Sequence, residues 1–159
     1  MKLPRTIQLD PSDTNVFALA AAPGEWAVTG TFAFVDSTPD QMDTKTQLAF
    51  KSGWLGLSSF GFSTFVQVTV VPEGEDEAAA RALATHLFEV YGAPDMLMAM
   101  TAAKSEIAYA ASLCDQPAGT LLAIEREMTE EGITEKIRVM PRPDEEGGHA
   151  QIWTLTEDC

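Results

Sequence analysis

The chain of 159 residues has few of the side chains that build metal sites and disulfide frameworks. It has two cysteines, Cys114 and Cys159, and two histidines, His86 and His149, and no pair of them has the spacing of zinc ligands. Two cysteines are too few for a disulfide scaffold, which indicates a reducing compartment. We therefore expect no metal site and no cofactor.

Catalytic motifs are also missing. The chain has no GxSxG nucleophile elbow, and its glycine-rich stretch at 53–61 (GWLGLSSFG) is not a dinucleotide-binding GxGxxG. Cys114 falls at the end of an expected helix beside Asp115, and both features raise a thiol pKa, so we predict a buried, unreactive cysteine. Glu106 remains a possible acid–base group, although a partly exposed glutamate fits the same pattern. An enzyme is the less favoured reading.

Basic residues are scarce, with 10 Lys and Arg against 24 Asp and Glu, for a net charge of −14. This charge repels nucleic-acid phosphates and anionic membranes, so we expect neither as a partner. Mimicry of nucleic acid by an acidic surface is an alternative, but solubility is the simpler reason for the acids. The first ten residues lack the apolar region of a signal peptide, which predicts a cytoplasmic protein.

The most unusual feature that is present is a window without charge, residues 52–71. Its first part, Trp54–Phe62, mixes glycines, serines and aromatic residues, and such backbone can line a ligand pocket or a protein-binding surface. The candidate binding residues are therefore Trp54, Phe60 and Phe62. The alternative is that these aromatic side chains pack under a sheet. Three glycines, the serines and Gln67 make the window a poor membrane span.

Hydrophobic periodicity and turn residues predict the elements. We expect strands over 5–9, 26–35, 64–71, 120–128, 133–140 and 150–156, helices over 38–51, 75–91 and 95–113, and a helical turn or two within 14–22. Trp26 begins the clearest strand and is expected in the core, and the strand at 64–71 is expected inside the sheet. The prediction is one α+β domain, residues 1–159. It has a mostly antiparallel sheet of about five or six strands and three helices packed largely on one side.

Three methionines, Met96, Met98 and Met100, stand at the start of the third expected helix. They cannot all face one side, because alternate residues of a helix point in different directions. At least one of them is expected to be exposed, and flexible thioethers suit adaptable interfaces.

Several phrases of the sequence resemble an uncharacterised family of short bacterial proteins, a domain of unknown function. They are MKLPRTIQLDPSDTNVF, PGEWAVTGTFAF, KSGWLGLSSFGFSTFVQV, YGAPD and EIAYAASLCD. The resemblance covers residues 1 to about 140, with a variable tail. It implies an accessory protein associated with redox-enzyme gene sets, and it implies no catalytic residues.

We expect a non-enzymatic, cytoplasmic accessory or protein-interaction protein whose partner is another protein, with a homo-oligomer possible. The alternative is a small-molecule binding protein or small enzyme with a pocket near Trp54–Phe62.

Overall fold

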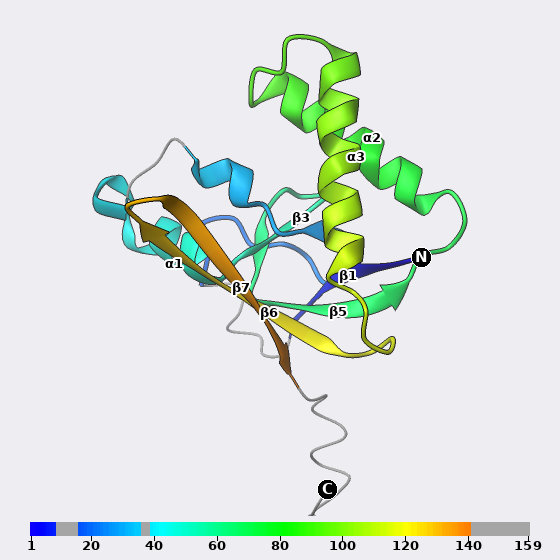
Figure 1. Cartoon of the computed structure of the whole chain (residues 1–159), viewed down its shortest axis with the longest axis horizontal. Helices are drawn as coiled ribbons and strands as arrows, with labels where there is room; N and C mark the ends of the chain where they lie inside the picture. Colours follow the sequence, from blue (N-terminus) through cyan, green and yellow to red (C-terminus); the bar gives the residue numbers. More distant parts are fainter. Residues whose placement is uncertain (9–15, 36–38, 141–159) are drawn as a thin grey trace, which may run out of the picture.

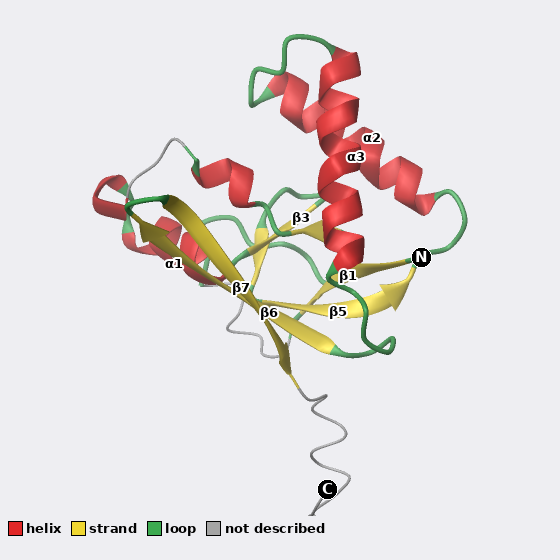
Figure 2. Cartoon of the chain, in the orientation of Figure 1, coloured by secondary structure: helices red, strands yellow, loops and turns green. Residues whose placement is uncertain are grey.

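The computed structural model describes residues 1–8, 16–35 and 39–140. In these residues two antiparallel sheets and three α-helices give an α+β fold, as the sequence predicts (Figures 1 and 2). The larger sheet has the order β1-β5-β6-β7 and the smaller one the order β2-β3-β4. The expected strand at 150–156 lies outside the described residues, as do His149 and Cys159.

Strand β5 (Phe65–Val70) lies inside the larger sheet, as its apolar residues predict. It pairs antiparallel with β1 (Lys2–Ile7) and with β6 (Leu121–Thr129). Strand β7 (Gly132–Met140) follows β6 through a tight turn at Glu130–Glu131. Gly132, directly after the turn, has a positive φ of 117° that a residue with a side chain rarely adopts.

The smaller sheet corrects the prediction of one long strand over 26–35. Only Ala27–Val28 is a strand, β2, and Thr31–Phe34 forms a short 3-10 helix, η2. The cause is Gly30, which has a φ of 79° and ends the extended backbone. A side chain at Gly30 would also collide with Leu55, because an added Cβ would lie 2.6 Å from the Leu55 Cβ atom.

The expected connector at 54–62 is more regular than predicted. It contains β3 (Trp54–Gly56), and its last residue begins β4 (Phe62–Ser63). β3 is the central strand of the smaller sheet, so its backbone groups bond to β2 and β4. Backbone hydrogen bonding, which a glycine-rich sequence does not reveal, explains why this segment can be buried.

The helix expected over 38–51 begins later in the structure than predicted. Pro39–Gln41 is a short 3-10 helix, η3, and α1 (Thr44–Ser52) begins after Asp43. The Asp43 carboxylate accepts a hydrogen bond from the Thr46 N–H at 2.7 Å and caps the helix. Gly53 follows the helix in extended backbone.

Two long helices, α2 (Glu75–Glu89) and α3 (Met96–Ser112), form an antiparallel hairpin close to the predicted ranges. Asp95 caps α3 by accepting from the Met98 N–H at 2.8 Å. The end of the hairpin that carries the connection, residues 90–95, projects away from both sheets (Figure 1). We call this end, residues 88–98, the hairpin tip. No helix in the described part of the chain has the length and apolar character needed to cross a bilayer.

The core corrects the role of Trp26. That side chain is half-buried, and the fully buried tryptophan is Trp54, which packs with Val66, Val68 and Leu122 between the sheets. Trp26 instead packs at the edge of the core, where its ring contacts the Arg5 guanidinium and its indole N–H reaches Glu75. A second cluster joins β1 and β2 to the helical hairpin, and a third, around Phe34 and Phe50, lies under α1.

Candidate functional site

The three candidate binding residues lie in different surroundings. Trp54 has no exposed surface and belongs to the core. Phe60 is half-buried and stacks on the His86 ring, with 3.8 Å between ring centroids. Phe62 packs its ring against Phe17 and Phe34. The three aromatic side chains therefore do not form one surface, and their role in binding stays a prediction.

A groove of about 650 Å³ lies beside Leu57–Ser59, within the predicted segment. Its other walls are residues 22–26 and the first half of α2. The Arg5 guanidinium lies over the Trp26 ring, 4.7 Å from its centroid, and its Nε–H donates to the Gly24 carbonyl at 2.9 Å. The Trp26 indole N–H donates to Glu75 at 2.8 Å. These contacts fix one cation and one aromatic ring at the groove.

The floor of this groove is held by a buried carboxylate. Glu25 is 7% exposed and accepts hydrogen bonds from the backbone N–H groups of Ala22, Ser58 and Ser59 at 2.7–3.0 Å. The turn at 58–59 thus points its N–H groups at a side chain of the same protein. Because Glu25 occupies those donors, its part in the structure is to fix the turn.

An aromatic row connects the predicted segment to the helical hairpin. Phe60 stacks on His86, the Tyr91 ring meets His86 edge-on at 5.4 Å, and Phe32 meets Tyr91 at 5.3 Å. Burial lowers the pKa of His86, while the Glu89 carboxylate has a smaller, opposite effect. A neutral imidazole is therefore favoured in this row, where it packs as an aromatic ring.

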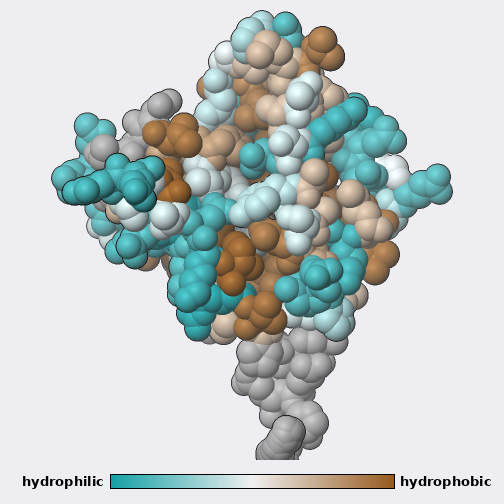
Figure 3. Space-filling model, viewed as in Figure 1, coloured by the Kyte–Doolittle hydropathy of each residue, from teal (hydrophilic) through white to brown (hydrophobic). Residues whose placement is uncertain are grey.

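Beyond this row, the hairpin tip exposes large apolar side chains (Figure 3). Six of them are 43–78% exposed: Phe88, Val90, Tyr91, Met96, Leu97 and Met98. The exposure of Met96 and Met98 agrees with the expectation from the methionine spacing. Monomeric proteins seldom gather so many apolar side chains on one projecting end, and such surfaces mark interaction sites. The tip is the strongest candidate surface for a protein partner.

Glu106 lies apart from both the groove and the tip. It is half-buried near Glu135, and burial, followed by the Glu135 charge, raises its pKa. Tyr109 donates its O–H to Glu135 at 2.5 Å. Burial and this hydrogen bond raise the pKa of Tyr109 to about 12. The two side chains are thus held in their protonated forms more strongly than usual.

The residue that sequence reasoning missed is Arg126, which is 5% exposed. Its guanidinium donates to the carbonyls of Thr29, Ala49, Phe50 and Gly53 and, through Nε, to the Thr31 hydroxyl. The sequence could have indicated its burial, because alternate residues of a strand lie on the same face. Arg126 therefore shares a face of β6 with the apolar residues Leu122 and Ile124. The N–H groups of Arg126 are occupied by acceptors of the protein itself, so its role is to hold these segments together.

The surroundings of Cys114 do not favour a nucleophilic thiolate. Cys114 is 2% exposed, and burial raises its pKa to about 11, so the thiolate form is disfavoured at neutral pH. In the described ranges, no three His, Cys, Asp or Glu side chains gather in a way that would hold a metal ion.

The model of a family of unknown function (DUF6505) matches residues 1–155. No curated protein and no solved structure matches the chain.

Proposed function

Because the chain belongs to the DUF6505 family, whose function is unknown, we propose a function from the structure: a non-enzymatic accessory protein of the cytoplasm that binds another protein through its hairpin tip. The observation that carries this proposal is the cluster of exposed apolar side chains on that projecting end. The link to a redox enzyme system comes from the resemblance of the sequence alone.

The shape of the hairpin supports docking by its end. α2 and α3 pack along each other, and the end of the hairpin lies away from both sheets (Figure 1). A projecting end can enter a concave surface of a partner without moving the sheets. Leu97 is 78% exposed at this end, and burying such a side chain contributes about 1.5–3 kcal/mol to binding.

The charges around the tip indicate the chemistry of the partner. Glu89 and Asp95 are exposed beside the apolar residues, and the whole chain has a net charge of −14. A partner surface with an apolar centre and a basic rim would complement both features and would be steered toward the tip.

The proposal is tested by affinity capture from a native lysate with matched variants. A Leu97→Ser, Met98→Ser variant changes two exposed tip residues. The control Leu19→Ser, Val139→Ser changes two side chains that are each 54% exposed elsewhere. We expect the same protein to be recovered with the wild type and the control and lost with the tip variant. Equal recovery with all three, at equal melting temperatures, would contradict the tip as the docking surface.

The alternative, a small-molecule binding protein, is favoured by the groove beside Leu57–Ser59 with its fixed Arg5 and Trp26. Glu106 does not line that groove, so the acid–base role considered for it has no pocket there. Native mass spectrometry discriminates the two. A metabolite bound to the purified protein, lost in an Arg5→Ala variant, together with no captured partner would support this alternative.

A further inference from the structure

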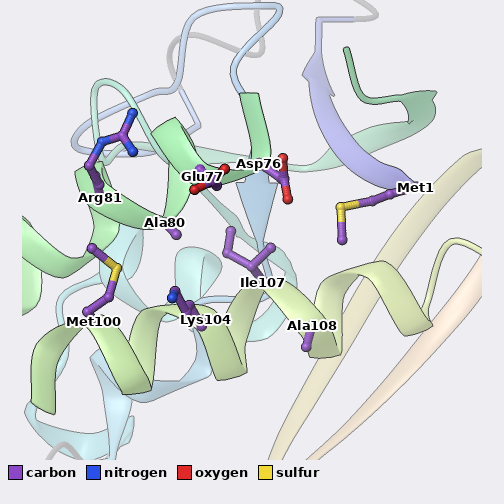
Figure 4. A pocket seen from close by; sticks show the side chains of 9 residues that line it. All are labelled: Met1, Asp76, Glu77, Ala80, Arg81, Met100, Lys104, Ile107 and Ala108. Carbon is purple, nitrogen blue, oxygen red and sulfur yellow. The ribbon is translucent and has the colours of Figure 1, made fainter. Parts of the chain in front are cut away.

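A second surface of the hairpin lies between its two helices, on the side that Figure 4 shows. It is a groove of about 300 Å³ with an apolar base formed by Ala80 of α2 and Ile107 and Ala108 of α3. Met100 closes the end that lies toward the tip, and Met1 closes the other end (Figure 4). We name this surface the interhelical groove.

The charged residues of the interhelical groove are separated along its length. Asp76 and Glu77 lie in the first turn of α2, toward Met1, whereas Arg81 and Lys104 lie toward Met100 (Figure 4). Among the described residues, neither Arg81 nor Lys104 has a carboxylate within ion-pair distance. The groove therefore presents an acidic end and a basic end on either side of an apolar base.

We propose that the interhelical groove receives an amphipathic helix of a partner protein, with acidic residues in its N-terminal half and basic residues in its C-terminal half. This inference rests on the proposed protein-interaction function. Two antiparallel helices leave a groove that a third helix fills with one apolar face. The small side chains of Ala80 and Ala108 allow a close approach of the third backbone.

The direction of the partner helix follows from the charges. Its acidic half meets Arg81 and Lys104, and its basic half meets Asp76 and Glu77. A helix is itself more stable with acids near its N-terminus and bases near its C-terminus, because these charges oppose its dipole. The partner helix then runs from the tip end toward Met1, parallel to α3 and antiparallel to α2.

The test uses two synthetic helical peptides of about 14 residues, four turns, with the same leucine face and no net charge. The first carries Glu in its N-terminal half and Lys in its C-terminal half, and the second reverses them. Neutral peptides avoid general attraction to the acidic chain. Binding is followed by NMR of ¹³C-methyl methionine, because Met100 and Met1 report on the groove, Met96 and Met98 on the tip, and Met42 on the core.

We expect saturable shifts of Met100 and Met1 with the first peptide, and at least about fivefold weaker binding of the second. An Asp76→Asn, Glu77→Gln variant should weaken this preference, because only Arg81 and Lys104 then distinguish the two peptides, and Ala108→Trp should block binding by filling the groove. The control Glu127→Gln, Glu130→Gln removes the same charge from exposed positions on β6 and its turn and should bind like the wild type.

Equal binding of both peptides, no saturable shift, or shifts confined to Met96 and Met98 would each overturn the groove proposal. None of these results bears on capture of a partner by the tip, so the two proposals fail separately. A zwitterionic amphiphile that shifts Met100 and Met1 while neither peptide does would also overturn it, and would identify the groove as a small-molecule site.

Discussion

At the scale of single residues, Arg126 joins segments that are far apart in the sequence. Its donors reach the end of α1, the bend after β2 and the Thr31 hydroxyl, and Thr31 in turn donates to Glu135 on β7. Burial lowers the pKa of Arg126 to about 10, while the Glu135 carboxylate has a smaller, opposite effect. The guanidinium is therefore still charged at neutral pH, and its hydrogen bonds offset the cost of burying it.

We predict that Arg126→Met is strongly destabilising although methionine fits an apolar strand face. The substitution leaves the carbonyls of Ala49, Phe50 and Gly53 without this donor. Each buried carbonyl that is left without a hydrogen-bond donor costs about 1–3 kcal/mol. Urea denaturation followed by circular dichroism measures the change. An unaltered denaturation midpoint would show that water or other donors replace the guanidinium.

The second residue-scale prediction concerns Tyr109. Its pKa is raised from 10.0 to about 12, first by burial and then by the hydrogen bond to Glu135. The protonated phenol is favoured in the folded state, so this stabilisation is complete below pH 10 and is lost as the pH rises from 10 toward 12. Ultraviolet titration of the wild type should show a late tyrosine ionisation.

Two variants assign that ionisation. Tyr109→Phe should remove it and leave that of Tyr91, whose pKa burial raises as well. Glu135→Gln should lower the pKa of Tyr109, because it removes the acceptor's charge. An ionisation near pH 12 that persists in Tyr109→Phe would contradict the assignment.

At the scale of elements, local hydrogen bonds decide where helices begin and one glycine decides where a strand ends. Asp43 and Asp95 each cap a helix through one backbone N–H. Gly30 turns the chain from β2 into η2 at a φ of 79°, against the Leu55 side chain. Strand β2 therefore ends at Val28.

We predict that Gly30→Ala destabilises the protein for two separable reasons. The left-handed backbone costs an alanine about 1–2 kcal/mol, and the new Cβ would lie 2.6 Å from the Leu55 Cβ atom. Gly92→Ala is the matched control, since Gly92 has a φ of 76° and nothing within 4 Å of an added Cβ. In thermal melts, Gly30→Ala should lose clearly more stability than Gly92→Ala. Equal losses would mean that Leu55 moves aside without cost.

At the scale of the whole molecule, the core is divided between the hairpin and the two sheets. Cys114 belongs to the cluster between the sheets, together with Trp54, Val66 and Ile124. The accessibility of the Cys114 thiol is therefore a measure of whether the core between the two sheets is intact. The exposed tip and the interhelical groove lie on the hairpin, outside that cluster.

This division gives a prediction for thiol labelling. In a Cys159→Ser background, Cys114 should react with iodoacetamide only through unfolding, because it is 2% exposed and its pKa is about 11. Its labelling rate should rise with urea in proportion to the unfolded population. Fast labelling in the absence of urea would contradict the buried position and reopen a reactive-cysteine function.

The sequence by itself determined the features that depend on neighbours along the chain. The periodicity of α2 and α3, the apolar alternation of β5 and the turn at Glu130–Glu131 all arise from local propensity, so they could be read before the fold. The exposure of at least one of the methionines at the start of α3 followed from helical geometry in the same way. The sequence also indicated an α+β class, because its strands occur in runs.

Only the tertiary structure decided which residues meet from distant segments. The end of the strand at Gly30 depends on Leu55, the burial of Trp54 depends on the pairing of β3 with two neighbours, and Arg126 depends on carbonyls far away in the chain. The interhelical groove likewise exists only once α2 and α3 are packed. Contacts of this kind follow from three-dimensional packing and hydrogen bonding, which leave no fixed spacing in the sequence.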